Sequence, residues 1–277
     1  MIWSITYGNE PYENAKQLNA WSAVNKGKVD KVIVYSPNDI DSDFYAENEK
    51  ILKEKRGNGY WLWKPYLILK TLNEIPENDY LIYSDAGIIF LKSIKVLIEK
   101  MEESNLSVMC FSIDLKEKHY SKRDAFILLN CDSPEFTDTE QRLSGFSIFK
   151  NTKQSREIVS QWLECCKDDR INTDKPNVMP YPNYEKFVEN RHDQTCWSLV
   201  TKTNHIPSFR DPCVSKRQHK TYSKEIAERS NYPQLIEAHR SGKLRTWKDY
   251  KKHKRKKVIK KIKKKLGIFL QHTLQKD

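Results

Sequence analysis

Three groups of residues in this sequence carry side chains that could do chemistry. Asp85 ends the apolar run DYLIYSDAG, and Asp193 and Gln194 open the segment RHDQTCWSLV. Earlier in the chain, RGNGYWLWKP places Lys64 among aromatic residues directly after a Gly-Asn-Gly loop. Carboxylates, an amide and a lysine can orient hydroxyl groups, hold a divalent cation, balance an anion or take up a proton.

Several better-known catalytic patterns are missing. The chain has no G-x-x-x-x-G-K-[ST] loop, no G-x-G-x-x-G after its first expected strand, no G-x-S-x-G and no His pair at metal-ligand spacing on a helix. Its six cysteines form no C-x-x-C, and two of them are adjacent. We therefore expect reduced thiols in a cytoplasmic protein, and neither a zinc site nor a disulfide framework.

Each candidate also has an ordinary structural interpretation. A lone carboxylate in an apolar strand is costly to bury unless it is paired or binds a metal, and the small residues Ala86 and Gly87 leave room beside Asp85. Asp85 could thus bind a cation that bridges to a diphosphate, or it could cap the next turn. Asp193 could act on a substrate or serve as the N-cap of a helix. The spacing alone leaves both alternatives open.

The elements that must position these residues alternate along the chain. Strands are expected at residues 1–8, 31–36, 79–87 and 106–114, and helices at 11–27, 41–55, from about 61 to 72, and at 93–104, with Gly27 as a helix C-cap. This order predicts an α/β fold with a doubly wound, mostly parallel sheet flanked by helices. Ligands of such sheets bind at the carboxyl ends of the strands, where Gly8 and Asp85 fall.

The loop before Lys64 has the composition of a ligand-binding wall. Gly57 and Gly59 permit close backbone approach, and the helix that begins near Trp61 points its N-terminus, which favours anions, at whatever the loop holds. Tyr60, Trp61 and Trp63 offer apolar faces, and Arg56 and Lys64 offer positive charge. For each tryptophan, packing in the core is the more common role.

The positive charge is concentrated at the C-terminus. Residues 243–265 hold 14 Lys or Arg and one acid, whereas residues 1–242 hold 34 basic and 35 acidic residues. Apolar residues between 258 and 274 fall near one helical face among lysines, with Gly267 as the weak point: Val258, Ile259, Ile262, Leu266, Phe269, Leu270 and Leu274. This pattern predicts an amphipathic helix at an anionic membrane surface. A solvated tail or a nucleic-acid contact is the alternative.

Blocks of this sequence resemble bacterial glycosyltransferases of the GT-A superfamily, in particular those of capsule and O-antigen biosynthesis. The resemblance covers residues 1–245 and is carried by GNGYWLWKPYLILKTL, DYLIYSDAG, SKRDAFILLNCD, QRLSGFSIFKNT, NRHDQTCWSLV and AHR, in that order. It implies transfer of a sugar from a nucleotide-diphosphate donor, with a UDP-sugar expected, to a hydroxyl of a growing surface glycan, free or lipid-linked. Residues 1–245 would be the catalytic domain and residues 246–277 a basic amphipathic helix.

The resemblance also implies roles for individual residues. Asp193 and Gln194 would be catalytic, with Asp193 orienting the sugar or acting as a base. The donor-binding residues that it implies are Tyr7, Gly8, Arg56, Gly59, Trp61, Lys64, Asp85, Ala86, Lys122, Arg123 and Asp124. Gly145 and Phe146 would line the acceptor cleft.

The metal is the point at which this sequence departs from the family pattern. In the superfamily a D-x-D motif at a strand end binds the cation, but here the matching place reads Asp85-Ala86-Gly87. The resemblance implies a divalent cation, Mn²⁺ or Mg²⁺, held by Asp85 and by His239. We expect the protein in the cytoplasm, peripherally bound to the inner face of the cell membrane.

Two other classes of protein remain open from the sequence. The missing second carboxylate would suit a noncatalytic module that binds a nucleotide or a glycan on the same fold. The basic tail would suit a nucleic-acid-binding protein, but residues 1–242 are nearly neutral, which does not favour a polyanion partner for the body. We therefore expect no nucleic acid among the partners.

Overall fold

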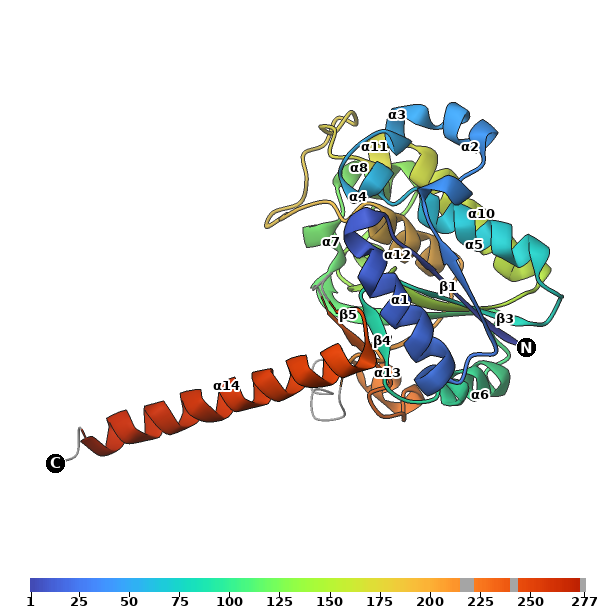
Figure 1. Ribbon diagram of the computed structural model, residues 1–277. Coiled ribbons are helices and arrows are strands. Elements are labelled where there is room, and N and C mark those ends of the chain that lie inside the picture. Colours follow the sequence, from blue (N-terminus) through green and yellow to red (C-terminus); the bar gives the residue numbers. More distant parts are fainter. Residues whose placement is uncertain (215–221, 240–243, 275–277) are drawn as a thin grey trace.

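The fold is built around one mixed β-sheet (Figure 1). A computed structural model describes residues 1–214, 222–239 and 244–274, with the side chains of the last helix described as far as residue 260 and at residue 262. The main sheet has the strand order β2-β1-β3-β7-β5-β6, and β8 pairs with β5. Its strands are β1 (Ile2–Tyr7), β2 (Lys31–Tyr35), β3 (Tyr80–Ser84), β5 (Val108–Lys116), β6 (Glu140–Arg142), β7 (Phe146–Lys150) and β8 (Ser208–Arg210).

The predicted mostly parallel α/β sheet is confirmed, with one difference. β1 pairs in parallel with β2 and with β3, and β5 pairs in parallel with β8. β7 is inserted antiparallel between β3 and β5, and β6 is antiparallel to β5. β3 and β5 are therefore not neighbours. The return of the chain through β6 and β7 places residues 143–145 at the edge of the sheet where β3 ends.

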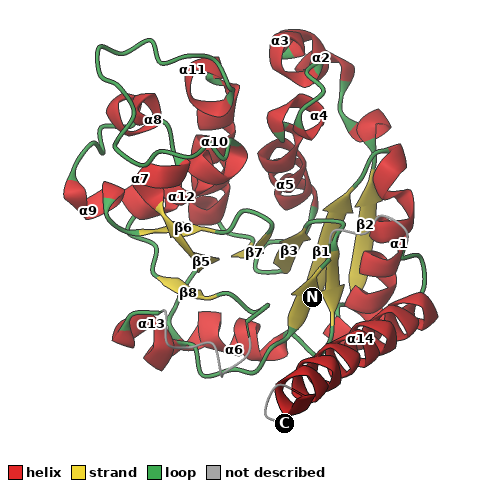
Figure 2. Cartoon of the chain, turned by 90° about the vertical axis from the view of Figure 1, so that its left-hand side faces the viewer, coloured by secondary structure: helices red, strands yellow, loops and turns green. Residues whose placement is uncertain are grey.

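Helices cover both faces of the sheet (Figure 2). The longer helices of the body are α1 (Glu13–Ser22), α5 (Trp63–Glu74), α6 (Lys95–Glu103), α10 (Lys153–Lys167) and α12 (Asp193–Thr203). Shorter helical segments are α2 (Ser42–Glu47), α3 (Glu49–Leu52), α4 (Gly57–Tyr60), α7 (Glu117–Tyr120), α8 (Arg123–Leu128), α9 (Pro134–Thr137), α11 (Asp169–Asn172) and α13 (Lys224–Arg229), with single turns at η1 (Glu10–Tyr12), η2 (Ala23–Gly27) and η3 (Pro37–Asp39). The predicted helices of the first half are thus present, although residues 41–55 form two short helices.

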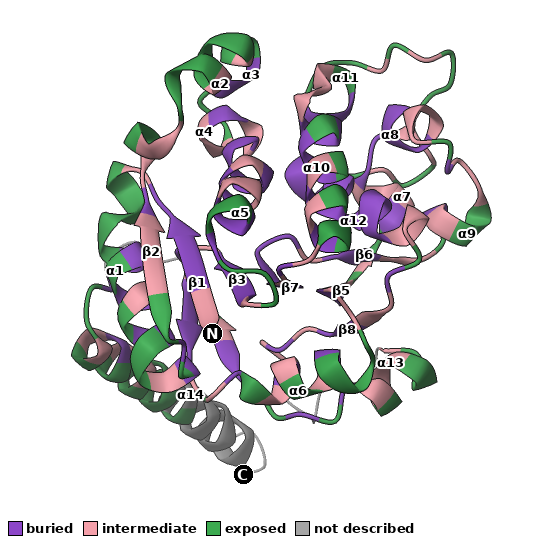
Figure 3. Ribbon diagram, turned by 90° about the vertical axis from the view of Figure 1, so that its right-hand side faces the viewer, coloured by how far each residue is buried: buried purple, intermediate pink, exposed green. Residues whose placement is uncertain are grey.

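The pleat of β3 separates two apolar cores. Leu81 and Tyr83 belong to the larger cluster, with residues of α5, α10 and α12, whereas Ile82 lies in a second cluster with Leu97 and Met101 of α6. β3 is buried along its whole length, while β2 at the edge is only partly buried (Figure 3). Successive side chains of a strand point to opposite faces, so a central strand with apolar or aromatic residues from Tyr80 to Tyr83 fits this arrangement.

The predicted role of Gly27 as a C-cap is wrong in detail. α1 runs into the π-helical turn η2, and the left-handed residue that ends it is Lys28, with φ 61°. Gly27 is needed for another reason. A Cβ atom at this position would lie 2.7 Å from Cδ1 of Phe90 in β4 (Ile88–Phe90). The glycine therefore permits close packing and does not supply a positive φ.

The C-terminal helix α14 (Trp247–Leu274) starts on the body and then projects away from it (Figure 1). Its first turn is closed by Asp249, which accepts hydrogen bonds from the backbone and hydroxyl of Thr246. Tyr250 is buried with Leu18 and Ile89, and its hydroxyl donates to Glu237 of β9 (Ile236–Ala238) at 3.0 Å. The helix root therefore packs on the small sheet that β4 and β9 form.

From residue 255 to 260 and at residue 262, the described side chains of α14 are exposed. Val258, Ile259 and Ile262 are 54%, 53% and 51% exposed. The side chains predicted to continue the stripe, at Leu266, Phe269, Leu270 and Leu274, lie outside the described residues. Over the described ranges, no helix combines the length and the apolar character that crossing a membrane requires.

Candidate functional site

The carboxyl edge of β3 brings the three chemical groups of the sequence together. Asp85 directly follows β3, Lys64 lies in the first turn of α5, and Asp193 is the first residue of α12. The Lys64 ammonium donates to Oδ2 of Asp193 at 2.6 Å and to the Ser144 hydroxyl at 3.3 Å, and it lies 3.5 Å from Oδ1 of Asp85. We call Lys64, Asp85 and Asp193 the ion cluster.

The ion cluster has a buried part and an exposed part. Lys64 and Asp193 are 2% and 5% exposed at their side chains, whereas the Asp85 side chain is 46% exposed. The expectation of a lone, buried carboxylate at position 85 is therefore corrected. Asp85 has a charged neighbour, and its side chain is only partly buried. Its Oδ1 atom also accepts a hydrogen bond from the Tyr83 hydroxyl at 2.6 Å. One carboxylate thus faces solvent above a buried ion pair.

The electrostatics of the cluster keep its lysine charged. Burial acts to lower the pKa of Lys64, but Asp193 and Asp85 together outweigh it and hold that pKa above its ordinary value. Burial, followed by the neighbouring Asp85, raises the pKa of the Tyr83 phenol well above its usual range. Tyr83 therefore remains a hydrogen-bond donor to Asp85. Burial also raises the pKa of the Asp193 carboxyl, although Lys64 acts to lower it.

Asp193 does not act as the N-cap of α12. The N-cap is His192, whose side chain makes no capping hydrogen bond, and Asp193 is the first helical residue. Its carboxylate turns to Lys64 instead. The Trp162 indole donates to the carbonyl oxygen of Asp193 at 2.9 Å and so fixes the backbone there.

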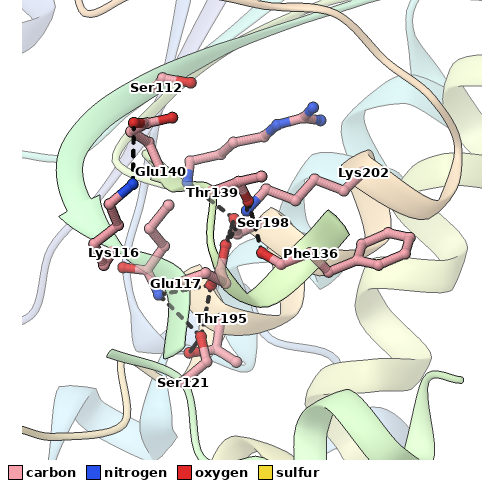
Figure 4. Close-up of polar contacts among 12 residues, drawn as sticks. Ser112, Lys116, Glu117, Ser121, Phe136, Thr139, Glu140, Thr195, Ser198 and Lys202 are labelled. Atoms are coloured by element: carbon pink, nitrogen blue, oxygen red, sulfur yellow. Dashed lines mark hydrogen bonds and ion pairs between the residues drawn. The ribbon is translucent and has the colours of Figure 1, made fainter. Parts of the chain in front are cut away.

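Gln194 is connected to a buried polar network behind the site. Its amide donates to Oε1 of Gln141 at 2.7 Å, and the Gln141 amide donates in turn to Oε1 of Glu117 at 3.2 Å. Glu117 is fully buried and also accepts hydrogen bonds from Ser121, Ser198 and Lys202 (Figure 4). The donors around Glu117 satisfy this buried carboxylate, so the network fixes Gln194 from one side.

The Gly-Asn-Gly stretch is a left-handed turn, α4. All five residues from 57 to 61 have positive φ, including 49° at Tyr60 and 58° at Trp61. A side chain in this region costs about 1–2 kcal/mol per residue, and such strain is often found at functional sites. A Cβ atom on Gly59 would lie 2.7 Å from the Cα atom of Leu52. The two glycines are thus required by the backbone as well as by the space.

The aromatic residues near this turn divide into core and wall. Trp63 is 5% exposed and stacks on Tyr7 with 3.7 Å between the ring centroids. Asn58 donates to the Tyr7 hydroxyl, and burial raises the pKa of Tyr7 to about 12. These two rings are packing residues that support the turn. The half-buried Tyr60 and Trp61 are the aromatic side chains that reach the surface.

His192 is a site residue that the sequence reasoning missed. Its ring stacks on Trp61 at 5.5 Å and contacts Tyr60 at 4.9 Å, and its Nδ1–H donates to the Asn172 carbonyl at 2.9 Å. Its backbone is in an uncommon region, with φ 55° and ψ −120°. The histidine therefore joins the left-handed turn to Asp193. The RHDQ block indicated this part of the sequence. However, no pattern of residue spacing identifies the contact between His192 and Trp61.

Gly8 and Arg56, two of the predicted donor-binding residues, already have polar partners within the protein. Gly8 directly follows β1, and its carbonyl accepts a hydrogen bond from the Lys16 ammonium at 3.2 Å. Arg56 is 47% exposed and pairs with Asp174 at 3.1 Å and with Glu189 at 3.6 Å. The Arg56 guanidinium therefore fastens the turn to the 172–192 segment. Its predicted donor contact stays a prediction.

The predicted run from Lys122 to Asp124 is buried or paired, not a solvated surface. The Lys122 ammonium donates to the Lys175 carbonyl at 2.8 Å, and the Asp124 carboxylate accepts from the backbone of Val178 at 2.7 Å. The Arg123 guanidinium binds Asp132 at 3.2 Å. The polar partners of all three belong to segments outside the ion cluster, so their donor-binding role stays a prediction.

The predicted acceptor residues differ in position. The Gly145 carbonyl accepts from the backbone of Asp85 at 2.9 Å, and a Cβ atom on Gly145 would lie 2.6 Å from Oδ2 of Asp85. Gly145 therefore borders the exposed carboxylate. Phe146 is fully buried against Phe111, so only its backbone could border a cleft. Ala86 is also buried, at 5% exposed.

The predicted metal ligands are close along the backbone. The His239 amide donates to the Gly87 carbonyl at 2.8 Å, so β9 delivers His239 beside the end of the Asp85-Ala86-Gly87 stretch. Among the residues whose placement is described, no three His, Cys, Asp or Glu side chains converge as a metal-binding group. The Lys64 ammonium already lies beside the Asp85 carboxylate. These residues alone therefore do not fit a tightly held resident cation.

Comparison with known proteins finds similarity to solved structures, among them several glycosyltransferases. No protein-family model and no curated protein matches this chain. Similar solved structures include the apo form of mouse xyloside xylosyltransferase 1, which is 10% identical and covers 86% of this chain and 97% of its own, with a TM-score of 0.49. The galactosyltransferase LgtC in complex with donor and acceptor sugar analogues is 11% identical, with 90% and 93% covered and a TM-score of 0.48.

A third similar structure is the apo form of the glycosyltransferase GlyE from Streptococcus pneumoniae TIGR4. It is 14% identical, covers 86% of this chain and 54% of its own, and has a TM-score of 0.41. Identities and scores this low transfer no residue roles to this chain. The site is therefore argued from its own geometry.

Proposed function

We propose that this protein is a glycosyltransferase that moves a sugar from a nucleotide-diphosphate donor to a hydroxyl of a glycan. The observation that supports the proposal most strongly is the ion cluster, in which the exposed Asp85 carboxylate lies over the buried Lys64–Asp193 pair. This cluster is at the carboxyl end of β3, where open α/β sheets bind their ligands. It contains Asp85, for which the sequence resemblance implies donor and cation binding, and Asp193, for which it implies a catalytic role.

The exposed carboxylate is the group we assign to the donor sugar. Asp85 is held by Tyr83 and Lys64 through Oδ1, so its orientation is fixed before a substrate arrives. A preorganised carboxylate binds sugar hydroxyls without the cost of ordering it first. Gly145 borders the same carboxylate and leaves the space that a sugar ring needs.

The buried carboxylate has a different role in this proposal. Asp193 accepts a hydrogen bond from the Lys64 ammonium and is 4% exposed. We therefore assign it to positioning Lys64, and through Lys64 also Asp85, in preference to removing a proton from the acceptor. Gln194, fixed by Gln141, is the neighbouring group that we assign to the sugar.

The left-handed turn and α5 form the proposed donor wall. Tyr60 and Trp61 present aromatic faces, and α5 begins directly after them at Trp63. An α-helix N-terminus carries roughly +0.5 of an elementary charge and favours phosphate groups. A UDP-sugar is the donor that we propose, with the aromatic side chains packing against base or sugar and the helix start facing the diphosphate.

The divalent cation is proposed as a companion of the donor. Asp85, with His239 nearby, is the ligand that the chain would offer, and diphosphate oxygens supply the remaining ligands that Mn²⁺ or Mg²⁺ requires. When bound, such a cation would neutralise charge that develops on the leaving diphosphate. The residues described here do not complete a site without the donor.

The acceptor and the location are proposed from α14. The described part of this helix exposes Val258, Ile259 and Ile262 among lysines, which is typical of a helix that lies on anionic lipid. We propose that α14 holds the enzyme on the inner face of the cell membrane, where it extends a surface glycan of the capsule or O-antigen type. A lipid-linked acceptor would be concentrated there.

The experiment that tests this function is a donor screen. The full chain is incubated with a panel of nucleotide sugars, and release of the nucleoside diphosphate is measured. The proposal expects release from one donor class, and loss of that release in Asp85→Asn. Binding of a donor without turnover under any condition would favour the noncatalytic module.

A further inference from the structure

Arg142, at the end of β6, is a buried arginine whose guanidinium forms no ion pair with the residues that the structure describes. The residue is 9% exposed, and its Nη1 atom is buried with no hydrogen-bond partner. Among the described residues its guanidinium takes part in no ion pair, although its backbone amide donates to Ser198 at 2.9 Å. Buried charges in proteins are normally paired, because an uncompensated one is costly.

This arginine lines a cavity on a side of β6 away from the ion cluster. The cavity has a volume of about 330 Å³, and its lining includes Arg142, Lys202, His205, Ser112 and Ser208. The hydroxyls of Ser112 and Ser208 lie 2.8 Å apart. Cationic and hydroxyl groups on one wall, with room for several non-hydrogen atoms, suit an oxyanion.

A second cation in the cavity lining, Lys202, already has an ion-pair partner. Lys202 donates to Glu117 and to Thr139 (Figure 4). The pKa of Lys202 is lowered, chiefly by burial. The Glu117 carboxylate acts to raise this pKa, and the nearby positive charge of Arg142 acts to lower it further. Of the two acids in the lining, Glu140 is 3.6 Å from the Lys116 ammonium. The remaining acid, Glu135, is exposed. Within the described lining, Arg142 is therefore the buried cation for which no ion pair is found.

We infer that this cavity is an oxyanion-binding site in which the Arg142 guanidinium binds the phosphate or carboxylate group of a small molecule. The planar guanidinium matches two oxygens of such a group at once, and the cavity supplies hydroxyl donors beside it. The inference goes beyond the proposed function and does not depend on it.

A route connects this site to the ion cluster. Arg142 and Gln141 are consecutive in β6, so their side chains point to opposite faces of the strand. Gln141 holds Gln194 at 2.7 Å, and Ser144, two residues after Arg142, contacts Lys64 at 3.3 Å. An anion that fixes the end of β6 therefore also stabilises the positions of these two contacts.

The test measures thermal unfolding with added anions. The full chain is titrated with inorganic phosphate, with sulfate and with glucuronate, against NaCl at matched ionic strength. A saturable rise of about 2–4 °C in Tm at high occupancy is expected for the wild type. Response to phosphate and sulfate would identify a phosphate-type ligand, and response to glucuronate alone would identify a carboxylate.

Variants separate binding from folding. Arg142→Met should match the stability of the wild type in NaCl, because it removes an unpaired buried charge, and should lose the anion-dependent shift. Lys153→Gln, which removes an exposed lysine that does not line the cavity, should keep the shift. Arg142→Lys should still bind the anion, but with an affinity reduced about tenfold or more. Lysine keeps the positive charge but lacks the planar guanidinium that binds two oxygens at once.

Three results would overturn the inference. The first is a wild type that shows no saturable shift with any of the three anions. The second is an Arg142→Met variant that shifts as much as the wild type. The third is an Arg142→Met variant that is less stable than the wild type in NaCl alone, which would assign Arg142 a structural role.

Discussion

The Lys64 ammonium lies 2.6 Å from Oδ2 of Asp193, although 129 residues separate the two in the sequence. The contact joins α5 to α12 across the larger core, and it supports the exposed Asp85 from below. The same pair therefore connects the stability of the fold to the geometry of the candidate site.

Loss of Asp193 is expected to destabilise the protein strongly. Asp193→Ala leaves the Lys64 ammonium buried, with the Asp85 carboxylate at 3.5 Å as its nearest counter-charge. Breaking a buried ion pair in this way costs about 3–5 kcal/mol. Urea unfolding measures the change. The matched variant Asp85→Ala removes a carboxylate that is 46% exposed and should cost roughly 1 kcal/mol. Equal losses in the two variants would contradict this division of roles.

The left-handed turn predicts an intolerant glycine. Gly59→Ala places a Cβ atom 2.7 Å from the Leu52 Cα atom at a φ of 93°. The strain alone costs about 1–3 kcal/mol, and backbone atoms cannot move aside easily. The control is Lys28→Gly, at an exposed residue with φ 61°, which removes a side chain from the left-handed region and should be at least as stable as the wild type. Unfolding midpoints test both, and a fully stable Gly59→Ala would exclude the left-handed turn.

His192 predicts a loss of stability at acidic pH. Burial lowers the pKa of His192 below its ordinary value of 6.5, although Asp174 and the Asn172 carbonyl act to raise it and Arg56 acts with burial. As the pH falls through 6.5, the unfolded chain takes up the proton while the folded chain does not. Stability is therefore unaffected above this pH and decreases below it, as far as the folded pKa.

The measurement compares His192→Gln with the wild type. Urea midpoints at pH 7.5 and pH 5.0 should differ less in His192→Gln, because the variant has no group to protonate there. His253→Gln on α14 serves as the control and should keep the wild-type difference. An unchanged pH dependence in His192→Gln would assign the acid sensitivity to other groups.

The first turns of α14 pack on the body, which allows the predicted membrane contact of the outer helix to be tested separately from folding. A chain that ends after residue 256 keeps Tyr250 and Lys254, both of which contact Glu237. It should be as stable as the full chain but should lose binding to vesicles that contain anionic lipid, since each lysine near such a surface contributes about 1 kcal/mol. Vesicles of zwitterionic lipid give the baseline. Undiminished binding by the truncated chain would assign membrane contact elsewhere.

A chain that ends after residue 245 should behave differently. It lacks Tyr250, which is buried with Leu18 and Ile89, and so should lose stability as well as the tail. The predicted boundary between residues 245 and 246 coincides with the start of the helix. The first turns of α14 nevertheless pack with the body.

Much of the fold could be predicted because its signals are local. The β-branched and aromatic runs before Gly8 and Asp85 form β1 and β3, and the turn residues between them separate the helices. The meeting of Gly8 and Asp85 at one edge follows from parallel pairing of β1 and β3. These inferences need only residue patterns and the geometry of α/β sheets.

The rest depends on contacts between distant segments. Nothing in the segment from 146 to 150 indicates that β7 enters between β3 and β5. The stacking of His192 on Trp61 and the unpaired Arg142 likewise arise only when separate elements meet. Local patterns also cannot tell whether Lys64 forms an ion pair within the protein or is free to contact the nucleotide-sugar donor.

The most direct test of the central claim is turnover of nucleotide sugars by the full chain and by Asp85→Asn. The assay is run with Mn²⁺ and with EDTA, and the melting temperature of each protein is recorded alongside. The account predicts release of nucleoside diphosphate from one donor class, stimulated by Mn²⁺. It also predicts a loss of about 100-fold or more in Asp85→Asn, with an almost unchanged melting temperature. Wild-type rates in a folded Asp85→Asn, or no release from any donor by the wild type, would contradict it.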